Sequence, residues 1–200
     1  MLIHQIWLGK TIPLDLQVYM SAWTNIPGTQ YKLWRDEDLK VYDEDLERAC
    51  ISKLYATFKS DLLRNLILRD HGGLYLDTDC ERVGNIPDFT TYACVKNPSP
   101  HWPNPDNYII YSPKHGEQIC EILNYGYYHV PRWINTFNRF GSGAIIALYG
   151  DKYCFDSRSW CLHHHRFSWM ERQRQESVII PPSEQLPSPF KGGIDYEFQL

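Results

Sequence analysis

The feature that most constrains the fold is the segment Ser60–Asp79, SDLLRNLILRDHGGLYLDTD, where a helix pattern changes to a strand pattern at two glycines. Apolar residues recur every three or four positions along residues 53–71, which predicts an amphipathic helix. Gly72 and Gly73 are typical of a helix end, and the apolar run after them predicts a buried strand. A helix that turns back directly onto a buried strand is typical of α/β proteins.

The rest of the chain repeats this alternation. Further strands are expected at residues 2–8, 31–34, 91–95, 108–111 and 153–155, and further helices at 15–24, 35–49, 117–125 and within 140–149. We therefore predict a single α/β domain over residues 1–200 with a mostly parallel sheet. The proline-rich stretch at 97–107 is expected to lie outside the sheet interior, because proline cannot donate to a strand ladder.

Charge and composition argue against some classes of function. The formal net charge is −4, which disfavours a protein that binds a polyanionic nucleic-acid backbone. The N-terminal residues lack the pattern of a secretory signal, and no stretch approaches the ~18 apolar residues of a membrane span. The six cysteines are scattered without a C-x-x-C pair. We therefore expect a cytoplasmic protein with free thiols, no integral membrane segment and no nucleic-acid partner.

Two carboxylates end the strand that is expected after the glycines. Side chains two apart on a strand share a face, so Tyr75, Asp77 and Asp79 point the same way if the strand stays extended. Ligands of α/β sheets gather beyond the carboxyl ends of strands, and two carboxylates held there repel each other unless a cation or hydrogen bonds relieve them. A divalent metal does so and also binds phosphate oxygens. Alternatively, the two aspartates begin a turn and cap the backbone that follows.

The helix before this strand carries polar residues on one side. Ser60 and Asp61 lie four and three positions before Arg64, and the Gly-Gly turn can bring this side of the helix close to the end of the strand. Arginine is suited to bidentate binding of phosphate or sugar oxygens. The alternative is an ordinary ion pair within the helix, which contributes only about 0.2–0.5 kcal/mol.

Four segments, in this order, resemble the DXD sugar-transferase family: residues 3–9 (IHQIWLG), 31–34 (YKLW), 60–79 and 163–169 (HHHRFSW). That family includes capsular-polysaccharide-type glycosyltransferases and the yeast initiating mannosyltransferase, and it is distantly similar to the glucosyltransferase domain of large clostridial toxins. The resemblance implies a GT-A fold, with a Rossmann-like, mostly parallel sheet flanked by helices. It also implies a nucleotide-binding half at about 1–96 and an acceptor half with a closing C-terminal segment at about 97–200.

The resemblance further implies that seven residues bind the nucleotide-sugar donor: Trp7, Ser60, Asp61, Arg64, Tyr75, Asp77 and Trp169. Three of them, Asp61, Arg64 and Asp77, are also the catalytic candidates. Trp7 is expected to stack on the nucleobase, an interaction worth about 1–3 kcal/mol, and Trp169 is expected to lie on a loop that closes over the donor. Both tryptophans are also compatible with plain hydrophobic packing.

The same resemblance assigns a metal ion, Mn²⁺ or Mg²⁺, to Asp79 and His163. A neutral imidazole is a good metal ligand, but three consecutive histidines leave the choice among them open. If the segment is extended, His163 and His165 face one way and His164 faces the other. A zinc site made of a histidine and the two cysteines that precede it is a further alternative, although the spacing matches no standard pattern.

These assignments predict a metal-dependent glycosyltransferase that moves a hexose from a UDP- or GDP-sugar to a hydroxyl of a saccharide or glycan, and the resemblance suggests retention of configuration. A haloacid-dehalogenase-type phosphatase also uses a strand that ends in D-x-D, although it needs threonine or valine where this chain has Glu81. A non-catalytic sugar- or nucleotide-binding protein is the other alternative. Asn65 departs from the family pattern, which commonly has an aromatic residue there, and the short chain leaves the acceptor unspecified.

Overall fold

The computed structural model describes residues 1–52, 56–97, 104–129 and 139–164, and its centre is a six-stranded sheet in the order β2-β1-β3-β6-β5-β7. In chain order the strands are β1 (Leu2–Ile6), β2 (Gln30–Trp34), β3 (Gly73–Leu76), β5 (Ala93–Lys96), β6 (Pro105–Ser112) and β7 (Cys154–Phe155). Strand β1 runs parallel to β2 and β3, and β5 runs parallel to β7, whereas β6 is antiparallel to both of its neighbours. The mostly parallel sheet predicted from the sequence is therefore confirmed.

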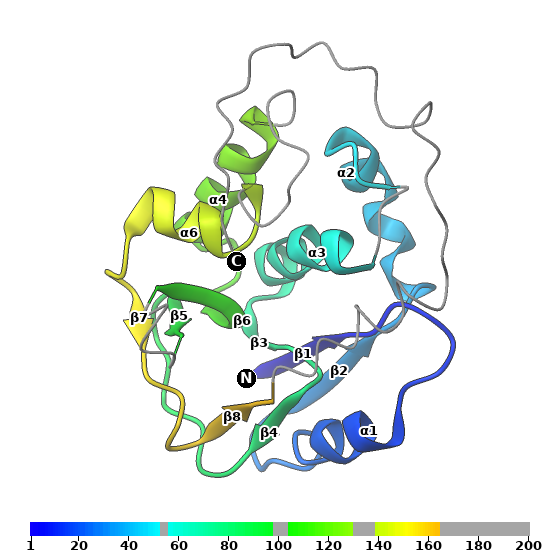
Figure 1. Ribbon diagram of the computed structural model, residues 1–200, viewed down its shortest axis with the longest axis vertical. Coiled ribbons are helices and arrows are strands. Elements are labelled where there is room, and N and C mark those ends of the chain that lie inside the picture. The colour runs from blue at the N-terminus through cyan, green and yellow to red at the C-terminus, as the bar shows by residue number, and fades with distance from the viewer. Residues whose placement is uncertain (53–55, 98–103, 130–138, 165–200) are drawn as a thin grey trace, which may run out of the picture. The chain divides into compact units, whose positions relative to one another are not determined.

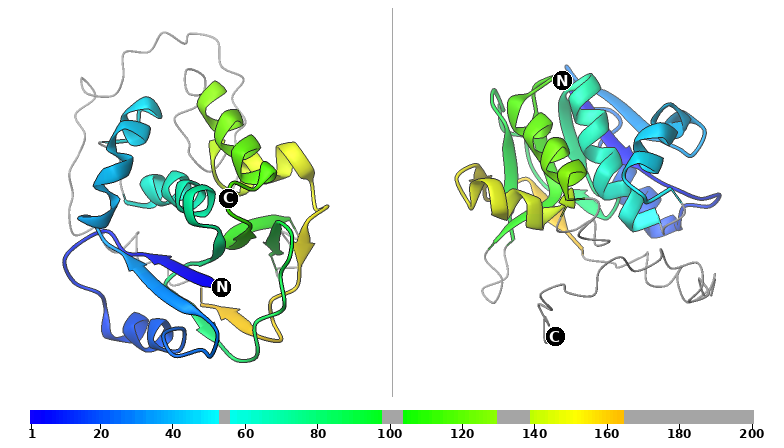
Figure 2. Two further views of the ribbon diagram at one scale, coloured as in Figure 1. Left: turned by 180° about the vertical axis from the view of Figure 1, so that it is seen from behind. Right: turned by 90° about the horizontal axis from the view of Figure 1, so that it is seen from above.

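Helices cover one face of this sheet, and a small second sheet covers the other. Figure 1 shows α2, α3, α4 and α6 on one side, and α1 with the antiparallel strands β4 (Cys80–Arg82) and β8 (Cys161–His163) on the other, a layering that the rear view of Figure 2 repeats. The helices are α1 (Leu14–Ser21), the 3₁₀ helix η1 (Asp38–Tyr42), α2 (Asp43–Arg48), α3 (Ala56–His71), α4 (Glu117–Tyr128) and α6 (Ser142–Tyr149). Within the described ranges, none of the helices has the length and apolar character that a bilayer crossing requires.

The two faces of β3 are buried in different hydrophobic clusters. Leu74 and Leu76 pack with Trp23 and Trp160 on the side of the small sheet. Tyr75 belongs instead to the larger cluster, which contains the apolar residues of α3. Because both faces are covered, the strand reads in sequence as a continuous apolar run. This arrangement holds the end of β3, and the residues that follow it, between the two layers.

Gly72 and Gly73 form the tight return from α3 to β3. Both have positive φ angles, 64° and 106°, and a Cβ on Gly73 would lie 2.4 Å from the backbone carbonyl oxygen of Leu2. A side chain at this position would push β3 away from β1, where Ile3 pairs with Leu74. The glycines therefore allow β3 to pair closely with β1, and this pairing places the aspartates just beyond the end of β3.

Strand β3 ends at Leu76, so the expectation of an extended strand up to Asp79 is wrong. The N–H of Cys80 donates to the carbonyl oxygen of Asp77 at 3.1 Å, which closes a turn across both aspartates. Strand β4 then begins at Cys80 and pairs with β8, so the chain leaves the main sheet at this turn. The alternative expectation, that the two aspartates begin a turn, is confirmed. This turn, and not the alternation of side chains along a strand, positions the two carboxylates.

The expectation that residues 97–107 lie outside the sheet is wrong for the last three of them. Strand β6 begins at Pro105 and lies between β3 and β5, in the interior of the sheet. Proline is tolerated at the first residue of a strand, and Pro105 pairs there with Lys96 beyond a bulge in β5. Residues 98–103 lie outside the described ranges. The charged segment expected as one helix at 35–49 divides into η1 and α2.

Candidate active site

The candidate site lies at the end of the main sheet where the carboxyl ends of β1 and β3 meet the start of β6. Because β1 and β3 are parallel they end at the same edge, and the antiparallel strand β6 starts there. Asp77 directly follows β3, and Asn107 lies near the start of β6. Helix α3 packs on these strands and carries Ser60, Asp61 and Arg64. The carboxyl ends of strands are where sheets of this class bind ligands.

Two carboxylates and an imidazole converge beside the turn after β3. The potential ligand atoms of Asp77, Asp79 and His163 all lie within 4.8 Å of one another, and His163 Nε2 lies 3.0 Å from Asp79 Oδ1. The pairing of Cys80 with His163 across β4 and β8 brings the imidazole to this position. Carboxylate oxygens with an imidazole nitrogen form a donor set that suits Mn²⁺ and accepts Mg²⁺. Among the described residues, this is the one cluster of three His, Cys, Asp or Glu side chains close enough to hold a metal ion, so no zinc site made of cysteines and a histidine is seen among them.

The structure distinguishes His163 from His164. The His163 ring stacks on Tyr108 with a centroid separation of 4.0 Å and faces the two aspartates. His164 is turned to the other side, where its ring stacks on Tyr19 at 4.3 Å and its Nε2 lies 2.8 Å from a carboxylate oxygen of Glu81. This is the alternation expected of an extended segment. The third histidine of the run lies outside the described ranges.

Arg64 joins three elements of the site instead of forming a simple pair within its helix. Its Nη2 lies 3.4 Å from Asp61 Oδ1 on the same helix, and its Nη1 lies 3.4 Å from Asp77 Oδ1 beyond β3. Nη1 also donates to the backbone carbonyl oxygen of Asn107 on β6 at 2.6 Å. The guanidinium further donates to Ser60, through Nε to its carbonyl oxygen and through Nη2 to its hydroxyl. The side chain is buried, so these contacts fix it firmly between the two carboxylates.

Asn107 belongs to the site, although no sequence motif marks it. Its Nδ2 donates to Asp61 Oδ1 at 2.9 Å, and its Oδ1 accepts from the Ser142 hydroxyl at 3.2 Å. Asn65, where the sequence departs from the family pattern, donates to the carbonyl oxygens of Asp61 and Phe140, both at 2.7 Å. These bonds orient the Asp61 region and connect α3 to the start of α6. The signal for Asn107 was its position directly before the apolar run of β6.

Tyr75 supports Asp77 from the helix-facing side of β3. Its hydroxyl donates to Asp77 Oδ1 at 2.8 Å, and its ring lies 4.8 Å from the guanidinium of Arg64. Gln5 of β1 donates through Nε2 to the backbone carbonyl oxygen of Asp77 at 3.0 Å. The side chain and the backbone of Asp77 are therefore both held by neighbouring elements, which is how a preorganised site is built.

The electrostatics of the site favour the binding of a cation. Burial raises the pKa of Asp77, and the charge of Asp79 raises it further, while Arg64 opposes both effects. Burial, the largest single effect, would lower the pKa of His163, but the hydrogen bond with Asp79 and the negative charges of Asp79 and Asp77 together outweigh it, and the pKa is raised. Two neighbouring carboxylates in a partly buried site are stabilised by a positive charge placed between them. The donor set and the charge distribution therefore both fit a divalent metal.

Trp7 follows β1 at the same edge of the sheet. It is 6% exposed and packs with Leu16 and Met20 of α1. Its indole N–H donates to the carbonyl oxygen of Thr11 at 3.0 Å. The structure thus shows hydrophobic packing of Trp7, and its stacking on a nucleobase stays a prediction. Trp169, the second predicted aromatic partner of the donor, lies outside the described residues.

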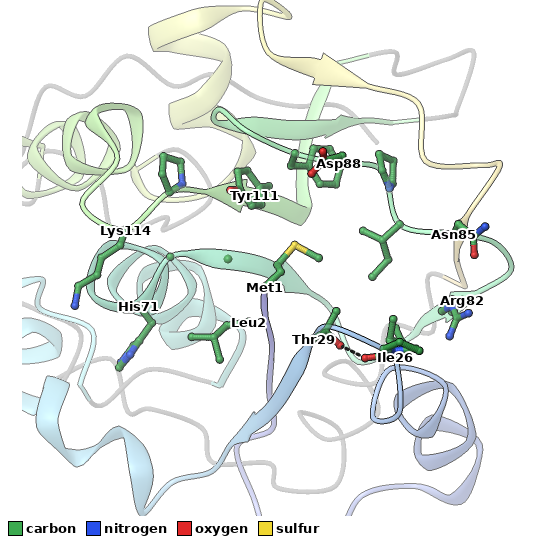
Figure 3. Close-up of a pocket in the computed structure, with 17 residues that line it drawn as sticks. Met1, Leu2, Ile26, Thr29, His71, Arg82, Asn85, Asp88, Tyr111 and Lys114 are labelled. Carbon is green, nitrogen blue, oxygen red and sulfur yellow. Dashed lines mark hydrogen bonds between the residues drawn. The ribbon is translucent and has the colours of Figure 1, made fainter.

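A separate cleft of about 610 Å³ opens at the opposite edge of the sheet, at the amino ends of β1 and β3. Figure 3 shows Met1 and Leu2 in this cleft together with Tyr111 and Lys114. None of the candidate site residues within the described ranges lines it. The site therefore rests on the convergence of side chains at the carboxyl ends of β1 and β3, and not on this cleft.

The fold of the chain is shared with a solved glycosyltransferase. The solved structure titled "PaToxG Glycosyltransferase" matches with a TM-score of 0.59 over 74% of this chain and 69% of that chain, at 19% sequence identity. At this level of identity the likeness shows a shared fold. The GT-A fold expected from the sequence is therefore confirmed.

The sequence comparisons find similarity over part of the chain. Residues 14–96 match the family model described as "Glycosyltransferase sugar-binding region containing DXD motif". Over 97 residues the chain is 34% identical to "Uncharacterized glycosyltransferase L373" of Acanthamoeba polyphaga mimivirus, a match that covers 44% of this chain and 38% of that protein. The chain thus matches less than half the length of this curated relative. The resemblance to the DXD sugar-transferase family is confirmed for the region that contains α3 and the two aspartates.

Proposed function

We propose that this chain is a divalent-metal-dependent glycosyltransferase that moves a hexose from a UDP- or GDP-sugar to a hydroxyl of a saccharide or glycan. The observation that carries the proposal is the convergence of Asp77, Asp79 and His163, whose ligand atoms lie within 4.8 Å of one another at the carboxyl edge of a GT-A sheet. The match of residues 14–96 to a DXD-containing sugar-binding region supports the same chemistry.

In this proposal Asp79 and His163, with Asp77 beside them, hold Mn²⁺ or Mg²⁺. A bound ion would supply Lewis-acid stabilisation of the negative charge on the departing nucleoside diphosphate. The protein's own contribution is to fix these side chains before the donor arrives. The Tyr75 hydroxyl and the Arg64 guanidinium hold Oδ1 of Asp77, and the pairing of β4 with β8 holds His163.

Asp61 and Arg64 bind the sugar in the proposed complex. A carboxylate beside a guanidinium offers an acceptor and a donor fork at fixed spacing, which suits the hydroxyls of a hexose. Both side chains are anchored, since Asn107 donates to Asp61 and accepts from Arg64. Ser60 supports Arg64 from the preceding turn of α3. Their rigidity would hold the anomeric carbon in one orientation toward the acceptor.

The nucleoside is proposed to lie between Tyr75, which already supports Asp77, and Trp7 at the end of β1. Trp169 is proposed to close over the donor and exclude water, which is a competing acceptor. We infer retention of the anomeric configuration from the family resemblance. The anomeric configuration of the new glycosidic linkage, read from an NMR spectrum of the product, would test the stereochemistry separately from the activity.

The experiment is a panel of UDP- and GDP-sugars incubated with Mn²⁺, with release of nucleoside diphosphate as the readout. We expect release from one donor class, loss of release on chelation, and recovery when Mn²⁺ is restored. Asp79→Asn should remove nearly all turnover. Asp88→Asn, on the exposed surface of the opposite cleft, is the matched control and should behave as the wild type.

Three outcomes would contradict the proposal. Turnover that survives chelation or Asp79→Asn would exclude the metal role. Release of inorganic phosphate from small phosphoesters, without any nucleoside diphosphate release, would favour a phosphatase. Thermal stabilisation by UDP or GDP without turnover of any donor would favour a non-catalytic binding protein.

A further inference from the structure

Strand β7, one of the two edge strands of the main sheet, carries one of two neighbouring thiols that the proposed transfer reaction does not use. Cys94 of β5 and Cys154 of β7 are direct partners on parallel strands, and their Sγ atoms lie 3.7 Å apart. Figure 1 shows β7 at the edge of the sheet beside β5. Adjacent strands are spaced about 4.7–4.9 Å apart, which falls within the Cα separation of about 4.4–6.8 Å that a disulfide spans.

The two thiols differ in access and in acidity. Cys94 is fully buried, whereas Cys154 is partly exposed. The hydrogen bond from Cys94 lowers the pKa of Cys154, and Lys96 also lowers it, while burial and Asp151 oppose them. The bond with Cys154, followed by burial, raises the pKa of Cys94. Cys154 is therefore the more acidic and the more accessible of the two thiols, so its sulfur is the one that an oxidant in solution would meet, with the Cys94 thiol beside it.

The other cysteines lack this combination of contact and access. Cys80 and Cys161 also form a hydrogen-bonded pair, but both are buried. Cys50 is exposed and Cys120 is partly exposed, and neither belongs to the two pairs. Oxidation of the folded protein should therefore distinguish among the six thiols.

We propose that Cys94 and Cys154 form a reversible disulfide that fastens the edge strand β7 to β5 when the protein meets a peroxide. The Cys154 thiolate attacks one oxygen of hydrogen peroxide, giving a sulfenic acid and hydroxide, which takes up a proton to form water. The Cys94 thiol then attacks the Cys154 sulfur, the S–S bond forms and a second water leaves. Two thiols lose two electrons in total, and one peroxide is reduced to two waters.

The bond should be easily reversed. Disulfides that are exposed are reduced more readily than those of rigid interiors, and β7 is a two-residue strand at the edge of the sheet. A thiol reductant such as glutathione should therefore restore both thiols. Formation of the bond closes a loop between residues that are 60 positions apart, and this restricts the unfolded chain. The oxidised protein should accordingly unfold at a higher temperature.

Peptide mapping after tryptic digestion tests the proposal on the wild-type protein. Cys94 is the sole cysteine of peptide 83–96, and Cys154 is the sole cysteine of peptide 153–158. After hydrogen peroxide treatment, blocking of thiols and digestion without reductant, we expect these two peptides joined, with a mass two hydrogens below their sum. The loss of free Cys94 should equal the loss of free Cys154, and glutathione should reverse both.

Variants separate this bond from general oxidation. Cys154→Ser should abolish both the joined peptide and the rise in unfolding temperature, whereas Cys120→Ser, which removes another partly exposed thiol, should keep both. If Cys154 is oxidised to sulfinic or sulfonic acid, or is joined to another cysteine, while Cys94 stays alkylatable after unfolding, the proposal is overturned. This readout needs no turnover, so it is independent of the proposed transferase function.

Discussion

His4 lies in the middle of β1, buried, with both ring nitrogens engaged. Its Nε2 lies 2.8 Å from the carbonyl oxygen of Gly72, and the indole N–H of Trp34 donates to its Nδ1 at 3.1 Å. A neutral imidazole carries one ring proton, so this proton must be on Nε2, where it is donated to Gly72. A second proton on Nδ1 would oppose the indole N–H. Burial lowers the pKa of His4 to about 4, with the Gly72 bond acting against this and the nearby His71 adding to it.

This low pKa makes folding depend on pH in a defined direction. The usual pKa of 6.5 applies to the unfolded chain, which therefore takes up the proton before the folded protein does as the pH falls. The stabilisation is fully present above about pH 6.5 and is lost progressively toward about pH 4. The difference of about 2.5 units corresponds to about 3 kcal/mol, of which about 2 kcal/mol is lost by about pH 5.

Urea unfolding of the wild type and of His4→Gln tests this reasoning. Glutamine can donate and accept a hydrogen bond but does not titrate, so other histidines cancel in the comparison. We expect the wild type to lose about 2 kcal/mol more than the variant between about pH 7 and about pH 5. An equal loss in the two proteins, or an NMR titration of His4 near its usual pKa, would refute the assigned proton position and the magnitude.

Three further predictions follow from the geometry. Gly73→Ala should lower the free energy of unfolding, measured in urea, by more than about 2 kcal/mol. Gly28 also has a positive φ, but a Cβ added there would meet no atom, so Gly28→Ala should lower the free energy of unfolding less. Equal losses would mean that the contact of Gly73 with β1 is unimportant. Arg64→Lys should destabilise the fold by about 2 kcal/mol and lower kcat/KM, because lysine cannot replace the guanidinium fork; unchanged kinetics would count against a role in donor binding. His164→Ala removes the ring that stacks on Tyr19 and so holds the end of β8, which carries His163. Mn²⁺ binding measured by calorimetry should become about tenfold weaker. An unaltered affinity would show that His163 does not depend on this stacking.

Local sequence patterns were sufficient for the elements that lead to the site. The apolar spacing of α3, the Gly72–Gly73 stop and the apolar run of β3 are each short-range signals, and all three features are present, although β3 ends at Leu76. The glycine pair is a strong signal because Gly73 cannot be replaced: its φ angle of 106° and its close contact with the backbone of Leu2 both exclude a side chain. Such features are readable because they depend on residues that are near one another in the chain.

The same patterns failed where the fold as a whole decides the conformation. The strand pattern continues past Leu76, but the backbone turns there because β4 pairs with a strand that lies about eighty residues later. The prolines before Asp106 suggested a loop, but β6 is fixed by pairing with both β3 and β5. Pairing partners distant in the chain leave no trace in local periodicity.

By itself, the sequence determined the α/β class, the GT-A resemblance and the identity of the two aspartates, because these are carried by contiguous motifs. Tertiary structure alone decided that His163, and not His164, faces Asp79, that Asn107 holds Asp61, and that Cys94 lies against Cys154. Each of these contacts joins segments separated by tens of residues. They exist because strand register fixes which side chains meet, and register is set by the packing of the whole sheet.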